Sequence, residues 1–139
     1  ITIPANTISL TNSALEVSAA FQNATTSGTC TFEIQVGTGS SSTTVAYVPS
    51  QNGESFLTLY ATSTTNLVAK GYTIQSATQV LDYLNNNDGA VLTTFESQRM
   101  LNMNGTSQFY VSFRGRHSTG GLHAVGCELL NESVKKINQ

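Results

Sequence analysis

Hydrophobic and polar residues alternate with a period of two along most of this chain. In one clear run the apolar residues occupy every second position from Leu15 to Phe21, and in the next they do so from Cys30 to Val36. Successive side chains of a strand point to opposite faces, so this pattern is typical of strands with one buried face. Residues 23–28 between the two runs are turn formers, which predicts a hairpin loop.

Eight further segments have strand character. They cover residues 7–11, 43–48, 55–62, 66–74, 90–95, 99–103, 107–113 and 122–130. Turn-forming stretches at 37–42, 49–53 and 104–106 separate some of them, at the close spacing expected of a sandwich or jelly roll. Because 139 residues is close to the commonest size of one domain, we predict an all-β fold. Residues 1–139 would form a single-domain antiparallel β-sandwich that is jelly-roll-like.

One segment departs from the alternation. Ser76 and Gln79 form a capping box, and the apolar residues at 77, 80, 81 and 84 follow helical spacing before three asparagines. We therefore predict one short helix near residues 76–84. Leu130, Val134 and Ile137 also recur at helical intervals, so the C-terminus either forms a second short helix or frays.

The last part of the chain carries one resemblance. It contains the apolar segment 100–103, a polar turn, the segment Phe109–Phe113, a glycine-containing loop and a final apolar stretch at 121–130. In this hydrophobic rhythm it resembles the closing half of a trimeric jelly roll of the complement C1q or tumour necrosis factor type. The resemblance implies a jelly-roll fold, and we carry over no function from it.

Cys30 and Cys127 are the only cysteines, and they lie too far apart for a local metal or redox motif. Each shares a strand face with apolar residues, so both side chains can point into one core. We predict a disulfide, which in the chain-entropy model stabilises the fold by about 4 to 5 kcal/mol. The alternative is a pair of buried free thiols that pack as small hydrophobic groups.

The amino-acid composition indicates where the protein is located. Ser, Thr, Asn and Gln occupy 56 of the 139 positions, whereas only 10% of residues are charged, against roughly 25% in an average soluble domain. Such a surface is typical of extracellular, cell-surface or virion-surface proteins. The chain starts at Ile1 without a methionine or a leader pattern, so we expect a processed or excised fragment.

Net charge and hydropathy argue against two kinds of partner, nucleic acids and membranes. The net charge of -2 provides no cationic face, so we expect no nucleic-acid binding. No apolar run approaches the length of about 18 residues that crosses a bilayer, so we expect no membrane insertion.

Titratable residues are scarce and no G-x-S-x-G motif is present, so we also expect that the protein is not an enzyme.

The densest group of candidate binding residues follows the apolar segment at 109–113. It contains Arg114, Arg116, His117 and His123 among several glycines, and we expect it to form a loop. Arginine forks beside a flexible backbone suit a carboxylate, sulfate or phosphate group of a ligand. The alternative is a solvated connection whose charges only remain hydrated. If the arginines are structural, the next candidates are the loops at 37–44 and 49–53.

Metal binding at the same place would need a different chemistry. His117, His123 and Cys127 would form a site only if the cysteine were free and a fourth ligand were present. We therefore predict no metal and no cofactor.

Three functional classes compete. We favour a non-enzymatic recognition domain, such as an adhesin, receptor-binding or lectin-like module, whose partner is a cell-surface glycan or protein receptor. The alternatives are a self-assembling structural subunit of a pilus, capsid or fibre, and a small secreted hydrolase. In the first two classes we expect a homo-oligomer or a place in a larger surface assembly.

Overall fold

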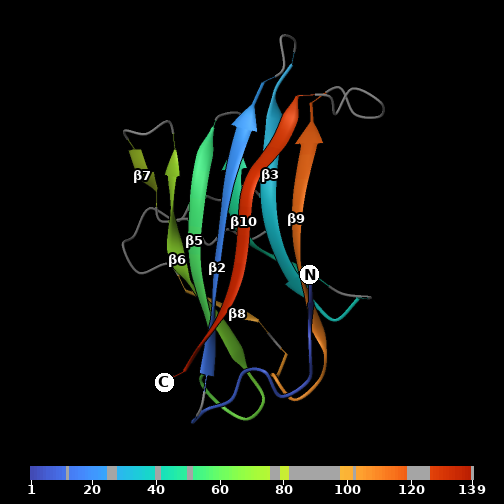
Figure 1. Ribbon diagram of the computed structural model, residues 1–139, viewed down its shortest axis with the longest axis vertical. Helices are drawn as coiled ribbons and strands as arrows, with labels where there is room; N and C mark the ends of the chain where they lie inside the picture. Colours follow the sequence, from blue (N-terminus) through green and yellow to red (C-terminus); the bar gives the residue numbers. More distant parts are fainter. Residues whose placement is uncertain are drawn as a thin grey trace.

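The computed structural model is all-β, with two antiparallel sheets that form a sandwich-like arrangement (Figure 1). It describes residues 1–11, 13–24, 28–39, 42–49, 52–75, 79–81, 98–101, 103–118 and 126–138. These residues contain ten strands and no helix. The predicted all-β class is therefore confirmed. Within the same residues, no helix is long and apolar enough to cross a membrane.

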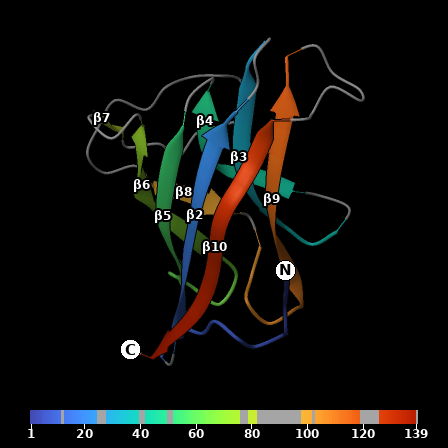
Figure 2. The same cartoon turned by 45° about the horizontal axis from the view of Figure 1, so that its top comes forward.

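Strands distant in the sequence lie side by side in both sheets. The order in the four-stranded sheet is β1 (Thr2–Ile3), β9 (Phe109–His117), β3 (Cys30–Gly37) and β4 (Ser42–Pro49). The order in the six-stranded sheet is β10 (Cys127–Asn138), β2 (Ser13–Asn23), β5 (Gly53–Ala61), β6 (Leu67–Gln75) and β7 (Gln79–Leu81), while β8 (Gln98–Leu101) pairs with the other half of β6. Figure 2 brings β4 into view.

The core consists of the inward positions of the alternating strands. Alternate residues of β2 and β3 from opposite sheets are buried, as the sequence predicts. The rings of Phe21 and Phe32 stack across the core with centroids 4.8 Å apart. Phe32 is 1% exposed and Ile34 is fully buried. The period-two pattern therefore identifies the faces that hold the sheets together.

A disulfide joins the two sheets at one end. Cys30 begins β3 in the four-stranded sheet, and Cys127 begins β10 in the six-stranded sheet. Their sulfur atoms are bonded, with the Cα atoms 5.5 Å apart. The predicted disulfide is confirmed.

The structure corrects the helical prediction near residues 76–84. Gln79, Val80 and Leu81 form strand β7, which pairs with Thr73–Gln75 at the end of β6. The other residues of this segment lie outside the described residues. A capping box contributes only about 1 kcal/mol, and backbone pairing on the open edge of β6 competes with it.

The C-terminal alternatives, a helix or a frayed end, are also wrong. β10 pairs antiparallel with β2 from Cys127 to Asn138, and the register shifts between Leu129 and Asn131. Leu130 is the extra residue of this β-bulge. The bulge interrupts the period-two pattern at Leu129 and Leu130, and beyond it Val134 and Ile137 lie on opposite faces of the strand.

Candidate ligand-binding site

The two predicted arginines project from a strand rather than from a loop. β9 continues to His117 and pairs with β3 along its whole length. Phe109 and Val111 face the core, so Arg114 and Arg116 occupy outward positions and are exposed. The expectation of a loop is wrong for residues 114–117, because β3 provides backbone partners for them.

Arg114 is held by a short chain of polar side chains. Its Nη1 atom donates a hydrogen bond to Gln35 Oε1 at 3.0 Å, and Ser42 Oγ donates to the same oxygen at 3.1 Å. Gln35 Nε2 in turn donates to Glu33 Oε2 at 3.0 Å. Gln35 is 8% exposed and Glu33 is 9% exposed, so the support beneath the guanidinium is almost fully withdrawn from water. This network fixes the position of the guanidinium.

A hollow of about 520 Å³ opens beside Arg114 on the outer face of the four-stranded sheet. Ser42, Tyr110 and Ser112 are among the residues that line it. Gly39 lies at its rim in the turn after β3, where φ is +100° and glycine is strongly preferred. A Cβ atom at Gly39 would lie 3.5 Å from Tyr110 Cε2, so this turn packs close to the ring. Residues 37–44, the second candidate region of the sequence, therefore contribute to the same hollow as Arg114.

The other predicted site residues are placed differently. Arg116 is exposed on the same face, opposite Thr31, and is not among the lining residues of the hollow. His117 is 5% exposed and pairs with Cys30, so the structure places it near the disulfide and not with the arginines. A Cβ atom at Gly28 would lie 2.6 Å from His117 Cε1, which shows how tightly the imidazole is packed. His123 lies outside the described residues.

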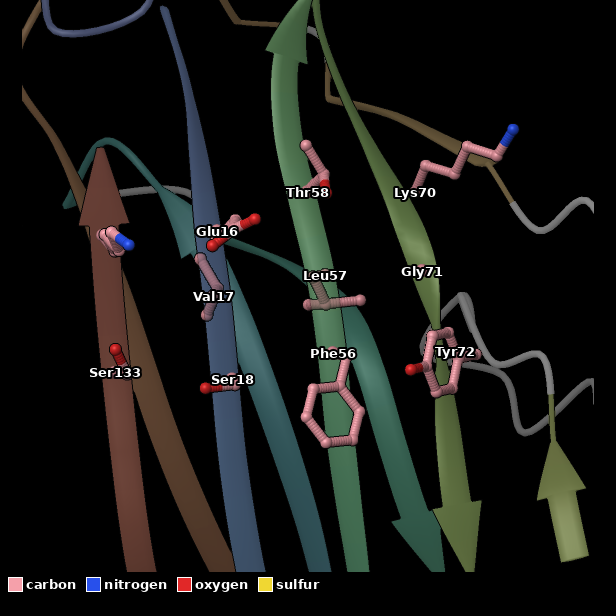
Figure 3. Close-up of a pocket in the computed structure, with 11 residues that line it drawn as sticks. Glu16, Val17, Ser18, Phe56, Leu57, Thr58, Lys70, Gly71, Tyr72 and Ser133 are labelled. Carbon is pink, nitrogen blue, oxygen red and sulfur yellow. The ribbon is translucent and has the colours of Figure 1, made fainter. Parts of the chain in front are cut away.

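A second hollow, of about 470 Å³, lies on the outer face of the six-stranded sheet (Figure 3). Phe56 of β5 and Tyr72 of β6 stand side by side there, with ring centroids 5.3 Å apart. Sequence reasoning missed this hollow because its walls come from four strands. One signal was present: Phe56 shares its strand face with Glu54 and Thr58, so the alternation of β5 assigns its ring to the polar face.

Comparisons with protein-family models, with curated proteins and with solved structures yield no match to this chain. The functional interpretation therefore depends on the geometry of the two hollows.

Proposed function

We propose that this chain is a non-enzymatic recognition domain of an extracellular, cell-surface or virion-surface protein. Its ligand is an anionic group on a surface glycan or protein receptor, and Arg114 is the central contact. The sandwich supplies a rigid support, and recognition occurs on the outer face of β3, β4 and β9. The disulfide is compatible with an oxidising compartment, which supports the proposed location.

The anchored guanidinium beside the hollow carries this proposal. Arginine has five N–H donors in a planar fork, and the bond to Gln35 occupies one of them. A carboxylate or sulfate suits the rest of the fork, because two parallel hydrogen bonds can form. Ser112 adds a hydroxyl and Tyr110 adds a half-exposed ring in the same hollow. Pre-organisation lowers the entropy that binding would otherwise cost.

One neighbouring group limits the charge of this site. Glu33 is the Cα partner of Arg114 on β3, so its carboxylate offsets part of the positive potential. Charge alone is then a weak attraction here. Selectivity must come from the geometry of the fork and the hydroxyl groups around it.

The test compares ligands that differ only in one acidic group. A glycan array with sialylated, sulfated and neutral members selects a glycan, and titration calorimetry then measures its Kd with and without the acidic group. A receptor-derived acidic peptide is measured in parallel. We expect Arg114→Ala to weaken binding of the acidic form by about 1.5 to 3 kcal/mol and to leave folding intact. Arg114→Lys retains the charge without the fork, so a partial loss is expected.

Arg116→Ala provides the matched comparison within the same strand. Arg116 lies on the same face without lining the hollow, so its loss should weaken binding less than the loss of Arg114. The double variant should show the largest effect. An acidic ligand that binds the folded double variant with unchanged affinity would contradict the proposal.

We also infer that residues 1–139 form a single domain with jelly-roll-like connectivity. β2 pairs with the last strand β10, β3 pairs with the preceding strand β9, and β5 and β6 form a hairpin between them in the sequence. Nested pairs of this kind are typical of a chain that is rolled up as one long hairpin.

The second candidate function is a self-assembling structural subunit, and the edge of β10 favours it. Within the described residues, β10 pairs only with β2, so its other edge is available to a second copy. In an antiparallel pair of two copies centred on Val134, Glu132 of each copy lies opposite Lys136 of the other. Both charged residues are exposed. This register is self-complementary, as a two-fold interface requires.

Charge reversal tests this second candidate. Glu132→Lys and Lys136→Glu should each abolish the dimer in sedimentation velocity measurements, because like charges then face each other across the strands. The combined variant restores opposite charges and should restore the dimer. If the wild type, both single variants and the combined variant all stay monomeric at 1 mM, assembly through β10 is contradicted.

A further inference from the structure

The hollow on the six-stranded sheet is built from two regular rows of outward side chains. The first row crosses β10, β2, β5 and β6 and consists of Ser133, Ser18, Phe56 and Tyr72. The second row crosses the same strands two residues further along and consists of Lys135, Glu16, Thr58 and Lys70. Four strands at the usual spacing span about 14 Å, and the rows lie about 7 Å apart.

The first row combines flat apolar surface with hydroxyl groups. Tyr72 is 41% exposed and Phe56 is half-buried beside it. Figure 3 shows their rings next to each other and the Ser18 side chain on the neighbouring strand. An exposed ring on a sheet face gains free energy when a ligand covers it. Ser18 and Ser133 place hydroxyl groups where a ligand resting on the rings would extend.

The second row supplies both hydrogen-bond donors and an acceptor. Lys135 and Lys70 carry ammonium groups at its two ends, and the Glu16 carboxylate lies between them on β2. Glu16 is the Cα partner of Lys135, so its carboxylate offsets one of the two ammonium charges and leaves the row with a net charge of +1. A purely apolar partner would remove these groups from water without replacing their hydrogen bonds. The occupant must therefore supply hydrogen-bonding groups as well as apolar surface, and a hydroxyl-rich ligand supplies both donors and acceptors.

Gly71 holds the two rings close together. It pairs with Leu57 directly beside the pair Phe56–Tyr72. A Cβ atom at this position would lie 2.8 Å from Leu57 Cα and would also clash with the Phe56 carbonyl oxygen. No other residue allows β5 and β6 to approach this closely without a backbone shift. The shape of the hollow thus depends on a residue that has no side chain.

We infer that this hollow is a second binding site, and that its ligand is a neutral saccharide chain. The ring faces of sugars carry C–H groups that pack on aromatic side chains, and their edges carry hydroxyl groups that both donate and accept hydrogen bonds. The first row offers the aromatic rings for the sugar faces, and the second row offers donors and an acceptor for the sugar hydroxyl groups. The site lies on the opposite sheet from Arg114, so its existence does not depend on the proposed anionic ligand.

The experiment uses the intact chain and a panel of neutral oligosaccharides on an array, followed by calorimetry with the strongest binder. Tyr72→Ala should raise Kd about tenfold to thirtyfold, because 41% of a side chain of about 200 Å² loses its cover. Tyr72→Phe retains the ring and should change Kd less than threefold. Leu10→Ala removes another exposed apolar side chain, 46% exposed and outside the hollow, and should have no effect.

Chemical-shift mapping by NMR with the same oligosaccharide needs no variant. Backbone signals of residues 16–18, 56–58 and 70–72 should shift, whereas those of residues 112–114 should not. The inference is overturned if no oligosaccharide of the panel binds at millimolar concentration, or if the shifts occur on another surface. Equal affinity of wild type and folded Tyr72→Ala would also overturn it. The Arg114→Ala variant should bind the neutral oligosaccharide normally, so failure of one site is distinguishable from failure of the other.

Discussion

Removal of the disulfide tests how the two sheets are held together. The double variant Cys30→Ala and Cys127→Ala cuts the only covalent link between β3 and β10 among the described residues. The bond closes a loop with a sequence separation of 97 residues. The chain-entropy relation assigns about 4.7 kcal/mol to a loop near this length. An average domain is stable by about 5 to 15 kcal/mol, so the variant should lose roughly a third or more of its stability.

Urea denaturation followed by circular dichroism measures this effect. We expect the midpoint to fall sharply in the alanine variant, and unfolded wild type kept reduced should refold with the same lowered midpoint. A loss of stability below about 1 kcal/mol would refute the reasoning, because the bond would then restrict the unfolded chain far less than its loop length requires.

Three further variants test the packing and the sites. Phe32→Ala should cost about 3 to 5 kcal/mol in urea denaturation, since it removes a ring that is 1% exposed and stacked on Phe21; a loss under 1 kcal/mol would argue against this core. Gly71→Ala should lower the thermal midpoint, because its Cβ would lie 2.8 Å from Leu57 Cα, and an unchanged midpoint would show that β5 and β6 do not approach so closely. Glu33→Gln should tighten binding of an acidic ligand about threefold or more in calorimetry by removing the carboxylate opposite Arg114, and unchanged or weaker binding would show that this carboxylate does not oppose the ligand.

The strands of the core were predictable because one face of each is buried. The alternation in β2 and β3 identifies their inward apolar residues and gives their ends to within two residues, because β2 begins at Ser13 rather than at Leu15. The same parity favoured the disulfide without deciding it, since Cys30 and Cys127 each shared a face with apolar residues in the sequence. Local patterns failed where pairing decided the outcome. Gln79–Leu81 carried a helical signal but completed the edge of β6 as a strand.

The sites were harder to predict because they depend on register. Arg114 could be identified as a candidate because arginines, histidines and glycines cluster around it in the sequence. Its support by Gln35 and Ser42, however, requires the pairing of β9 with β3 and the turn to β4. The second hollow joins residues from Glu16 to Lys135, and no local spacing relates them. Aromatic residues at polar-face positions of strands are the one signal that a sequence offers for such a surface.

The most direct test of the proposed recognition site is an NMR titration of the labelled protein with the acidic glycan that the array selects. The account predicts that the largest shifts cluster at Gln35, Ser42, Tyr110, Ser112 and Arg114, on the outer face of the four-stranded sheet. It also predicts that these shifts disappear in Arg114→Ala at the same glycan concentration. Shifts that are centred on another surface, or that persist unchanged in the variant, would contradict it.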